Sequence, residues 1–484
     1  MDKIAVEFKN YAFRYHNTVD WVLKDINFKL HHGELAVLSG LSGEGKSTLL
    51  YSINRIIPNI IQGECKGEFL LSGENALDKK PSEVSKLVGS VLQNADSQII
   101  NNVVEDEIAF GCENMSMDAG SISEAINKSC QLMNLQAEWF TKTLSGGQKQ
   151  RLITASILAM KQKILIFDEP LANLDLEGAH NLLLLLKELS KKGFAILIIE
   201  HRLDVVLPYA DTVAWLSDGH ISVSKPEERL EKYMGIIQLE PRNLPKIEKT
   251  PCFQLKDIEY TVGSRTILKD LSFTLYKGER VVILGENGCG KTTLMRLLSR
   301  LIKPTVGSYQ QYIEPAHKKK PSKTWFKKLG FVYQNPNYQL FMPSVQQEVD
   351  YQAKDSQYAE NMIQRFRLEE LTNRHPQSLS EGQKRRLTIA CVMAMEPEIL
   401  LLDEPTVGQD YDGLKNILEQ LQELHEKTNN TMVTITHDFR CAKAFADRIL
   451  WMKEGRIYKD GGRELADEYF EEILSSYRKI RMDS

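Results

Sequence analysis

The sequence predicts an α/β protein that contains two copies of one domain, each built around a mainly parallel β-sheet. The first observation is a glycine-rich segment that occurs twice, at residues 40–47 and 285–292. The second is that each copy follows a continuous apolar run, at 35–38 and 281–284. Further apolar runs cover 164–167, 194–199, 399–402 and 432–435. Short apolar runs bounded by polar turns are typical of strands that are buried on both faces of a sheet.

Length and composition support this organisation and exclude several classes of protein. A chain of 484 residues is too long for one ordinary hydrophobic core. The apolar share of 42% and the charged share of 26% are those of a soluble globular protein. A net charge of −4 gives no electrostatic basis for binding nucleic acid, so we expect no nucleic-acid partner. The basic run Lys318–Lys320 is expected to be a solvated loop.

The N-terminus lacks the apolar region of a secretory signal, and no apolar stretch reaches the roughly 18 residues that a membrane span needs. We therefore expect a cytosolic chain whose membrane role, if it has one, comes from partners. The 7 cysteines form no CxxC pair and no metal-ligand spacing. Reduced thiols in a reducing compartment are the simplest interpretation.

The internal repeat extends well beyond the glycine-rich segments. Lys46 and Lys291 are 245 residues apart, and two other landmarks recur in the same order at separations of 235 and 236 residues. These are Asp168-Glu-Pro with Asp403-Glu-Pro, and His201 with His437. We expect one domain over residues 1–235, a proline-rich and charged linker over 236–250, and a second domain over 251–484.

Both glycine-rich segments match the pattern GxxxxGK[ST], which surrounds a phosphate chain with backbone N–H groups. Lys46 and Lys291 are predicted to bind the β- and γ-phosphates of ATP, and the hydroxyls of Ser47 and Thr292 to bind Mg²⁺. The other residues predicted to bind the nucleotide here are Gly40, Gly43, Gly45, Thr48, Gly285, Gly288, Gly290 and Thr293.

An Asp-Glu pair follows an apolar strand in each half. Asp168 and Asp403 are predicted to hold Mg²⁺. Glu169 and Glu404, one residue later, are placed to activate the attacking water as general bases. Such a pair is ordinary surface in most proteins, and the phosphate-binding loop upstream is what favours the catalytic interpretation.

At this point the chain resembles the ABC ATPases. Leu144–Gln148 matches their signature motif, and Leu379–Gln383 matches it with one change; in each half the signature serine lies 23 residues before the aspartate of the Asp-Glu pair. The resemblance implies two P-loop cassettes, each with a mainly parallel core, an antiparallel β subdomain and a helical signature subdomain. It also implies that the γ-phosphate is contacted by Ser145, Gly147, Gln148, Ser380, Gly382 and Gln383.

The same resemblance implies further roles. Tyr15 and Tyr260 occupy the position of the family's adenine-stacking aromatic residue, although each could instead be an ordinary strand tyrosine. His201 and His437 match the switch histidine that contacts the γ-phosphate. The segments 172–175 and 407–410 match the D-loops. Because the family's cassettes pair head to tail, one ATP site would join Lys46 to Ser380 and the other Lys291 to Ser145, within one chain.

The segments 91–98 and 332–339 share a QNxxxQ pattern that looks like the Q-loops of energy-coupling factor (ECF) importers. This implies that Gln93 and Gln334 contact the nucleotide and its metal. It also implies a transmembrane T component and a substrate-binding S component as partners, at the cytoplasmic face of a bacterial membrane. Segments 104–111 and 200–202 fit the same group. The first would form part of a groove for the T component, in which Glu105, Asp106 and Glu107 would pair with arginines; a solvated acidic turn is the alternative.

The second half departs from the pattern. Gln346 and Gln347 replace two of the three groove acids, and Glu381 replaces the first glycine of the signature. A carboxylate there would repel the phosphates of the Lys46 site if it pointed inward, and would have little effect if it pointed outward. We hypothesise unequal sites, with the Lys291/Ser145 site the stronger in hydrolysis.

Two other functions compete with the importer. A soluble tandem ABC protein that acts on ribosomes would carry a long charged helical insert, for which a linker this short leaves little room. The fused ATPase of a sugar importer has a similar length but not the paired QNxxxQ loops. Residues 464–481 are predicted to form an amphipathic helix, whose packing partner the sequence does not identify.

Overall fold

The computed structural model describes residues 3–16, 18–41, 43–93, 95–172, 174–228, 237, 239, 249–313 and 321–472. The chain divides into two compact units, Met1–Met234 and Gly235–Ser484. The basic run 318–320 and most of the predicted linker lie outside the described residues. Of that linker, Ile237 is 1% exposed and belongs to the core of the second unit, against which Leu239 also packs.

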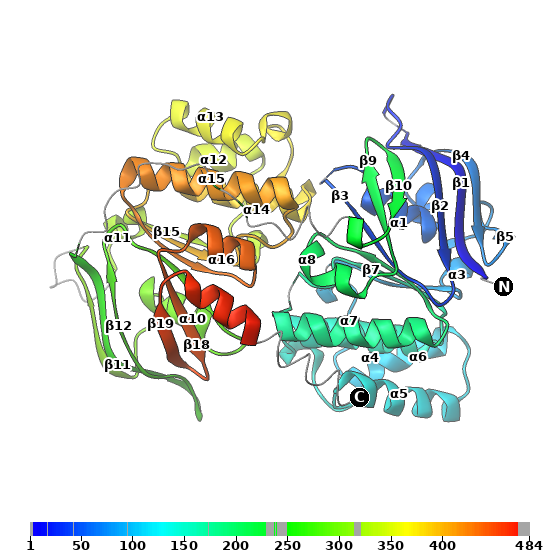
Figure 1. Cartoon of the computed structure of the whole chain (residues 1–484), viewed down its shortest axis with the longest axis horizontal. Coiled ribbons are helices and arrows are strands. Elements are labelled where there is room, and N and C mark those ends of the chain that lie inside the picture. Colours follow the sequence, from blue (N-terminus) through cyan, green and yellow to red (C-terminus); the bar gives the residue numbers. More distant parts are fainter. Residues whose placement is uncertain are drawn as a thin grey trace. The chain divides into compact units, whose positions relative to one another are not determined.

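A six-stranded sheet forms the centre of the first unit (Figure 1). Its order is β10-β9-β3-β8-β7-β6, and every pair is parallel except β10 with β9. The strands are β3 (Leu35–Gly40), β6 (Val88–Val91), β7 (Ile164–Asp168), β8 (Ala195–Ile199), β9 (Thr212–Ser217) and β10 (His220–Ser224).

The second unit repeats this sheet strand for strand, in the order β19-β18-β13-β17-β16-β15. Its one antiparallel pair is again at the edge, between β18 and β19. The strands are β13 (Arg280–Leu284), β15 (Leu329–Val332), β16 (Ile399–Asp403), β17 (Thr431–Ile435), β18 (Arg448–Lys453) and β19 (Arg456–Gly461). The predicted duplication and the mainly parallel cores are confirmed.

Each unit also has a separate antiparallel sheet. In the first it is β2-β1-β4-β5, formed by β1 (Ile4–Tyr15), β2 (Leu23–His31), β4 (Gly63–Leu71) and β5 (Glu74–Asn75). In the second it is β12-β11-β14, formed by β11 (Pro251–Val262), β12 (Arg265–Tyr276) and β14 (Val306–Gln311). These sheets are the antiparallel β subdomains implied by the resemblance to ABC ATPases.

The helices of each unit follow the same order, except that α2 has no counterpart in the described part of the second unit. In the first they are α1 (Lys46–Ile53), α2 (Ile56–Asn59), α3 (Pro81–Val84), α4 (Val104–Asn114), α5 (Ala119–Met133), α6 (Gly146–Ala159), α7 (Leu176–Lys191) and α8 (Leu203–Val206). In the second they are α10 (Lys291–Leu298), α11 (Lys323–Lys328), α12 (Val345–Gln352), α13 (Ser356–Arg365), α14 (Glu381–Met393), α15 (Tyr411–Thr428) and α16 (Phe439–Phe445). Helices α4, α5 and α6 gather on one side of the first unit, away from its antiparallel sheet (Figure 1).

Burial explains why the central runs form strands. Every residue of β3, β8, β13, β16 and β17 is buried, as expected for strands covered on both faces. Helix α7 is buried along one side only, because its apolar residues recur at helical spacing. Those residues include Leu182, Leu183, Leu186 and Leu189.

The predicted C-terminal helix lies partly within the described residues. Residues 464–472 are helical, and the remainder to 481 lies outside the described part. The Tyr469 ring packs edge-on against Trp451 at 5.2 Å, and Phe470 against Phe439 at the same distance. The described turns of this helix therefore pack on the second unit itself.

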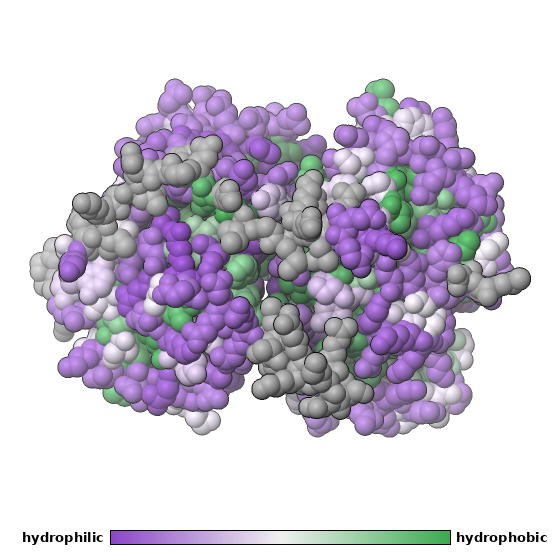
Figure 2. All heavy atoms as spheres, viewed as in Figure 1, coloured by the Kyte–Doolittle hydropathy of each residue, from purple (hydrophilic) through white to green (hydrophobic). Residues whose placement is uncertain are grey.

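Within the described residues, no helix is both long enough and apolar enough to span a bilayer. The face drawn in Figure 2 is covered mainly by hydrophilic residues, with apolar residues scattered among them.

Candidate functional site

Each glycine-rich segment forms a tight loop between a central strand and a helix. Gly40 ends β3, and α1 begins at Lys46. A Cβ on Gly40 would lie 2.2 Å from the carbonyl oxygen of Leu216, so this backbone path excludes any other residue. Gly45 and Gly290 have φ angles of 100° and 105°, in the left-handed region that favours glycine.

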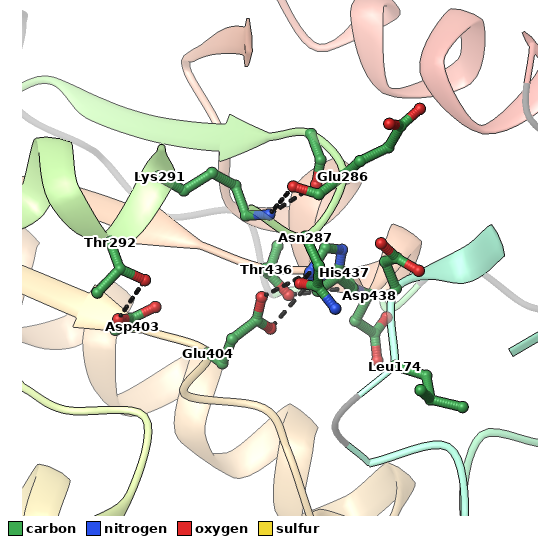
Figure 3. Close-up of polar contacts among 12 residues, drawn as sticks. Leu174, Glu286, Asn287, Lys291, Thr292, Asp403, Glu404, Thr436, His437 and Asp438 are labelled. Carbon is green, nitrogen blue, oxygen red and sulfur yellow. Dashed lines mark hydrogen bonds and ion pairs between the residues drawn. The ribbon is translucent and has the colours of Figure 1, made fainter. Parts of the chain in front are cut away.

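The lysine that opens each helix folds back over its own loop. The Lys46 Nζ donates to the carbonyl oxygens of Gly40 and Leu41 at 2.9 and 2.7 Å. Lys291 does the same to Gly285 and Glu286 at 2.7 and 2.9 Å (Figure 3). An ammonium group beside the N-terminus of a helix is suited to a phosphate.

The Asp-Glu pairs lie at the carboxyl ends of β7 and β16. Glu169 and Glu404 have φ angles of 47° and 51°, a costly conformation for a non-glycine residue. Their backbone N–H groups donate to the carbonyl oxygens of Ile199 and Ile435 at 2.9 and 3.0 Å. These bonds to the neighbouring strand stabilise the strained turn that orients each glutamate.

In the first unit, Glu169 is held from two sides. The Gln93 Nε2 donates to its Oε2 at 2.8 Å, and the His201 Nε2 lies 3.5 Å from its Oε1. Burial alone would raise the pKa of Glu169, but His201, Lys46 and Gln93 together hold that pKa below its ordinary value. The structure thus brings together the Q-loop glutamine, the carboxylate and the switch histidine of this half.

The pKa of Asp168, next to this group, shifts in the opposite direction. Burial raises the pKa of Asp168 to about 7, and the negative charge of Glu169 acts in the same direction. His201 and Lys46 oppose the shift without cancelling it. A divalent cation would remove the cost of ionising this carboxyl, so its environment fits a metal ligand.

In the second unit the contacts differ. The Thr292 hydroxyl donates to Asp403 Oδ2 at 3.1 Å. The His437 Nε2 lies 3.3 Å from Glu404 Oε1, and the His437 backbone N–H donates to Glu404 Oε2 at 3.2 Å (Figure 3). The same Nε2 is 3.2 Å from Asn287 Oδ1, in the glycine-rich loop.

A hollow of about 270 Å³ joins most of the predicted residues of the second unit. Its lining contains the predicted residues Gly288, Gly290, Lys291, Thr292, Thr293, Gln334, Asp403 and Glu404. A cationic amine, a hydroxyl and a carboxylate around one hollow form a donor set that fits a nucleoside triphosphate with a divalent metal.

Four lining residues were not predicted: Arg265, Ile267, Asn287 and Ile435. Arg265 opens β12, and the Ile267 backbone lies against the loop, because a Cβ on Gly290 would be 3.3 Å from its carbonyl oxygen. Asn287 lies within the glycine-rich segment, and Ile435 ends the apolar run 432–435. No motif marks Arg265 and Ile267, and only the packing of β12 against Gly290 reveals them.

The two tyrosines have different surroundings. The Tyr15 hydroxyl is 2.9 Å from Thr48 Oγ1, which ties it to α1, and its ring meets Phe13 edge-on at 5.0 Å. Tyr260 packs at the margin of the apolar core, and the lining residues of the hollow at Lys291 do not include it. Tyr15 is thus tied to the helix that follows the glycine-rich loop, whereas Tyr260 contacts the apolar core.

Each signature motif begins a helix through a reciprocal cap. Ser145 accepts from the Gln148 backbone N–H at 3.3 Å, and its own N–H donates to Gln148 Oε1 at 2.9 Å. Ser380 and Gln383 repeat this arrangement at 3.3 and 3.0 Å. The motif residues thus fix the N-terminus of α6 and of α14.

The side chain of Glu381 points along its own helix, to Lys384, with Oε1 and Nζ 3.1 Å apart. This ion pair shows the orientation of the Glu381 side chain, which the sequence does not determine. The carboxylate at the start of α14 is compensated by a cation one turn later.

The D-loops pack against the signature motif of the same unit. A Cβ on Gly147 would lie 2.9 Å from Leu174 Cδ2, and one on Gly382 would lie 2.7 Å from the carbonyl oxygen of Gly408. Asp175 and Asp410 cap α7 and α15 through their side chains. Asn173, within the first D-loop, lies outside the described residues.

The second glutamine of each QNxxxQ pattern has a structural role. The Gln98 side chain accepts from the Leu92 N–H at 2.7 Å and donates to the Ser90 carbonyl at 3.0 Å. Gln339 makes the same pair of bonds with Tyr333 and Phe331, at 3.0 and 2.6 Å. Each side chain therefore closes the loop that carries Gln93 or Gln334.

The three predicted groove acids are not equivalent. Glu107 is 5% exposed, and its Oε2 accepts from the backbone N–H groups of Ile100 and Asn101 at 2.9 and 2.7 Å. Glu348 is fully buried and accepts in the same way from Phe341 and Met342. Because Glu107 is occupied in this way, only Glu105 and Asp106 are exposed for a partner.

Two phosphate-binding loops, each with a lysine, a hydroxyl residue and a strand-end Asp-Glu pair, define a P-loop nucleoside triphosphatase. The model of the ABC transporter family matches residues 23–172 and 268–407. The chain therefore belongs to the ABC transporter family, as an ATPase with two cassettes in one polypeptide.

Relatives match nearly the whole chain. A Methanosarcina mazei protein with the provisional name ABC transporter ATP-binding protein is 32% identical, over 95% of this chain and 89% of that protein. A Bacillus subtilis protein with the provisional name HMP/thiamine import ATP-binding protein YkoD is 33% identical, over 93% and 90%. The archaeal ribosome recycling factor aABCE1, solved with the stalk protein aP1, is 19% identical, with a TM-score of 0.67 over 96% of this chain and 92% of that one. At that identity the likeness concerns the fold.

We predict that Asp168→Asn stabilises the protein without nucleotide or metal, and that the gain is larger at pH 8 than at pH 5. With a pKa raised from 3.8 to about 7, folded Asp168 holds a proton that the unfolded chain releases between those values. Stability therefore falls as pH rises through that window. Scanning calorimetry in EDTA should show a melting temperature raised by about 2–4 °C per kcal/mol gained at pH 8. The matched change Asp403→Asn should give a smaller gain, because Thr292 already favours the ionised form; a gain from Asp168→Asn that is equal at both pH values would contradict the assignment.

We also predict that Glu107→Ala destabilises the first unit by about 1–3 kcal/mol, because the backbone N–H groups of Ile100 and Asn101 lose a buried charged acceptor. Glu105→Ala, in the exposed part of the same turn, should stay within about 0.5 kcal/mol of the native chain. Urea unfolding monitored by circular dichroism measures both. Equal effects of the two changes would show that the hydrogen bonds of Glu107 do not stabilise the first unit.

Proposed function

We propose that the chain is the ATPase subunit of an ECF-type importer for a vitamin or related micronutrient. The observation that carries the proposal is the pair of QNxxxQ loops, each followed by a helix with exposed apolar and aromatic residues around it. The Bacillus subtilis relative named for HMP/thiamine import supports this class and favours a thiamine precursor as cargo. The substrate would be selected by a separate S component in the membrane.

The proposed docking surface lies along α4 and α12 and the segments beside them. In the first unit it contains Ile100, Phe110 and Phe140, which are 67%, 41% and 62% exposed, beside the exposed acids Glu105 and Asp106. In the second it contains Tyr338, Phe341 and Tyr351, at 78%, 63% and 67%. Apolar side chains exposed together are a common feature of protein interfaces. The two surfaces would receive helices of the T component, with the first also offering carboxylates to arginines.

Each cassette would bind ATP through the residues already described. Lys46 and Lys291 would hold the β- and γ-phosphates, while Ser47 and Thr292, Asp168 and Asp403, and Gln93 and Gln334 would hold Mg²⁺. When bound, Mg²⁺ neutralises charge on the phosphates. Glu169 or Glu404 would accept a proton from the attacking water while the water oxygen forms a bond to the γ-phosphorus. The bond between the γ-phosphorus and the ADP oxygen would break in the same step, which releases phosphate and ADP. His201 and His437 would contact the γ-phosphate, and Tyr15 and Tyr260 would stack on adenine.

We further propose that the cassettes pair head to tail within the chain. The signature residues Ser145, Gly147 and Gln148 would then complete the site of Lys291, and Ser380, Gly382 and Gln383 that of Lys46. The fusion of the two cassettes would keep both halves at high effective concentration. The likeness to the ribosome recycling factor, at 19% identity, does not favour a ribosomal role.

We predict that affinity purification of this chain from detergent-solubilised membranes recovers a polytopic membrane protein and a small substrate-binding membrane protein. The double change Glu105→Arg/Asp106→Arg should reduce this recovery strongly, since it places cations against partner arginines. ATP binding by the purified chain should be unchanged, because both positions lie outside the nucleotide residues. Recovery of ribosomal proteins in place of membrane proteins would overturn the importer assignment.

We predict unequal losses from the two substitutions of the proposed bases. Removal of a general base costs about 10²- to 10⁴-fold at its own site. Because the Lys291/Ser145 site is proposed to be the stronger, Glu404→Gln should reduce total phosphate release more than Glu169→Gln. Steady-state ATPase rates of the two purified chains provide the comparison, and equal losses would contradict unequal sites.

A further inference from the structure

A buried carboxylate lies beside the first ATPase site with no counterpart in the second. Glu200, at the end of β8, is 3% exposed. Its Oε1 accepts from the backbone N–H groups of His201 and Arg202 at 2.8 and 3.1 Å, and its Oε2 accepts from that of Leu171 at 3.2 Å. A buried carboxylate is costly unless it is hydrogen-bonded, and three N–H donors offset that cost.

Arg202, two residues after Glu200, also bonds to the segment that contains Leu171. The Arg202 guanidinium donates to the carbonyl oxygens of Leu171 and Leu174 at 3.2 Å each. Leu171 and Leu174 belong to the segment between Glu169 and α7. This segment therefore donates to Glu200 through the Leu171 N–H and accepts from Arg202 through two carbonyl oxygens. We call Glu200 and Arg202, with these five backbone hydrogen bonds, the Glu200–Arg202 clasp.

The second unit lacks this clasp. Thr436 stands in place of Glu200 and Thr406 in place of Leu171, and their hydroxyl oxygens are 3.3 Å apart. There the His437 backbone N–H donates to the proposed base, Glu404, rather than to a separate carboxylate. In the first unit Glu200 accepts the corresponding N–H of His201, and Glu169 accepts from Gln93.

We propose that Glu200 is a positioning residue for hydrolysis at the first site. It fixes the backbone of His201 to the segment after Glu169, and it keeps the His201 N–H away from Glu169, so that Glu169 stays in contact with Gln93. Arg202 holds the same segment in place. The inference rests on the role proposed for His201, and it concerns the first cassette alone.

A double-mutant cycle on the full chain tests this inference. Steady-state phosphate release is measured for Glu200→Gln, His201→Ala and the two together, each in a Glu404→Gln background so that only the first site is read, with kcat and KM for ATP determined separately. The amide of Glu200→Gln can accept only at its oxygen, so one of the two sides of the clasp is lost. We expect kcat to fall about tenfold, as for misplaced catalytic groups, with KM for ATP within twofold of the native value. The double variant should be no slower than His201→Ala alone, because both changes remove one function.

The controls separate a positioning role from a structural one. Glu7→Gln removes another largely buried carboxylate of the first unit, which is paired with Lys29 in the antiparallel sheet, and it should leave kcat unchanged. Glu200→Asp keeps two acceptor oxygens and should recover part of the lost rate. If Glu200→Gln does not fold, Leu171→Thr/Glu200→Thr installs the hydroxyl pair of the second unit and enters the same cycle.

Three outcomes would overturn the inference. The first is an unchanged kcat for Glu200→Gln while His201→Ala is slow, which leaves the role of His201 intact. The second is a loss that multiplies with that of His201→Ala, which would indicate a structural effect. The third is a fully active His201→Ala, which would remove the proposed role of His201 together with this inference.

Discussion

The parallel pairing of three central strands in each cassette is the constraint on which the rest of the site depends. In the first unit Leu38 of β3 pairs with Ile199 of β8, and Ile199 pairs in turn with Asp168 of β7. In the second, Ile283, Ile435 and Asp403 form the same row. Since the carboxyl ends of parallel strands meet at one edge, this register places the phosphate loop, the Asp-Glu pair and the switch histidine side by side. A hydrogen bond from each glutamate N–H then extends the ladder one residue beyond the strand.

On this common frame the two cassettes hold their proposed bases differently. Glu169 contacts Gln93 and His201, whereas Glu404 contacts the side chain and the backbone of His437. The difference follows from one residue at the end of the neighbouring strand, because Glu200 accepts the histidine N–H that Thr436 leaves to Glu404. Two sites with the same motifs therefore differ in the network that orients the carboxylate proposed as the base.

The sequence predicts the features that depend on backbone periodicity and on fixed spacing. The duplicated motifs, the apolar runs before them and the equal separations indicate the parallel cores and both phosphate loops. The features that it leaves undetermined depend on where one side chain points. In the sequence Glu107 is one of three neighbouring acids, but in the structure it is buried and bonds to the backbone of Ile100 and Asn101. In the sequence Gln98 is part of a family pattern, but in the structure its amide closes the Q-loop. Such contacts arise from tertiary packing, for which no local spacing is diagnostic.

The orientation of Glu381 changes the physical basis of the hypothesis of unequal sites. A carboxylate aimed at the phosphates would act by direct repulsion, but Glu381 is paired with Lys384 of its own helix. The first signature has Lys149 at the equivalent position and Gly146 in place of the glutamate. Over its first four residues α14 is thus one positive charge poorer than α6, and the next residue, Arg385 in place of Gln150, donates to the backbone carbonyls of Tyr333 and Gln334. If the signatures face phosphates in the proposed head-to-tail pairing, the site of Lys46 would meet the weaker positive potential, and the difference would diminish as salt screens the exposed charges.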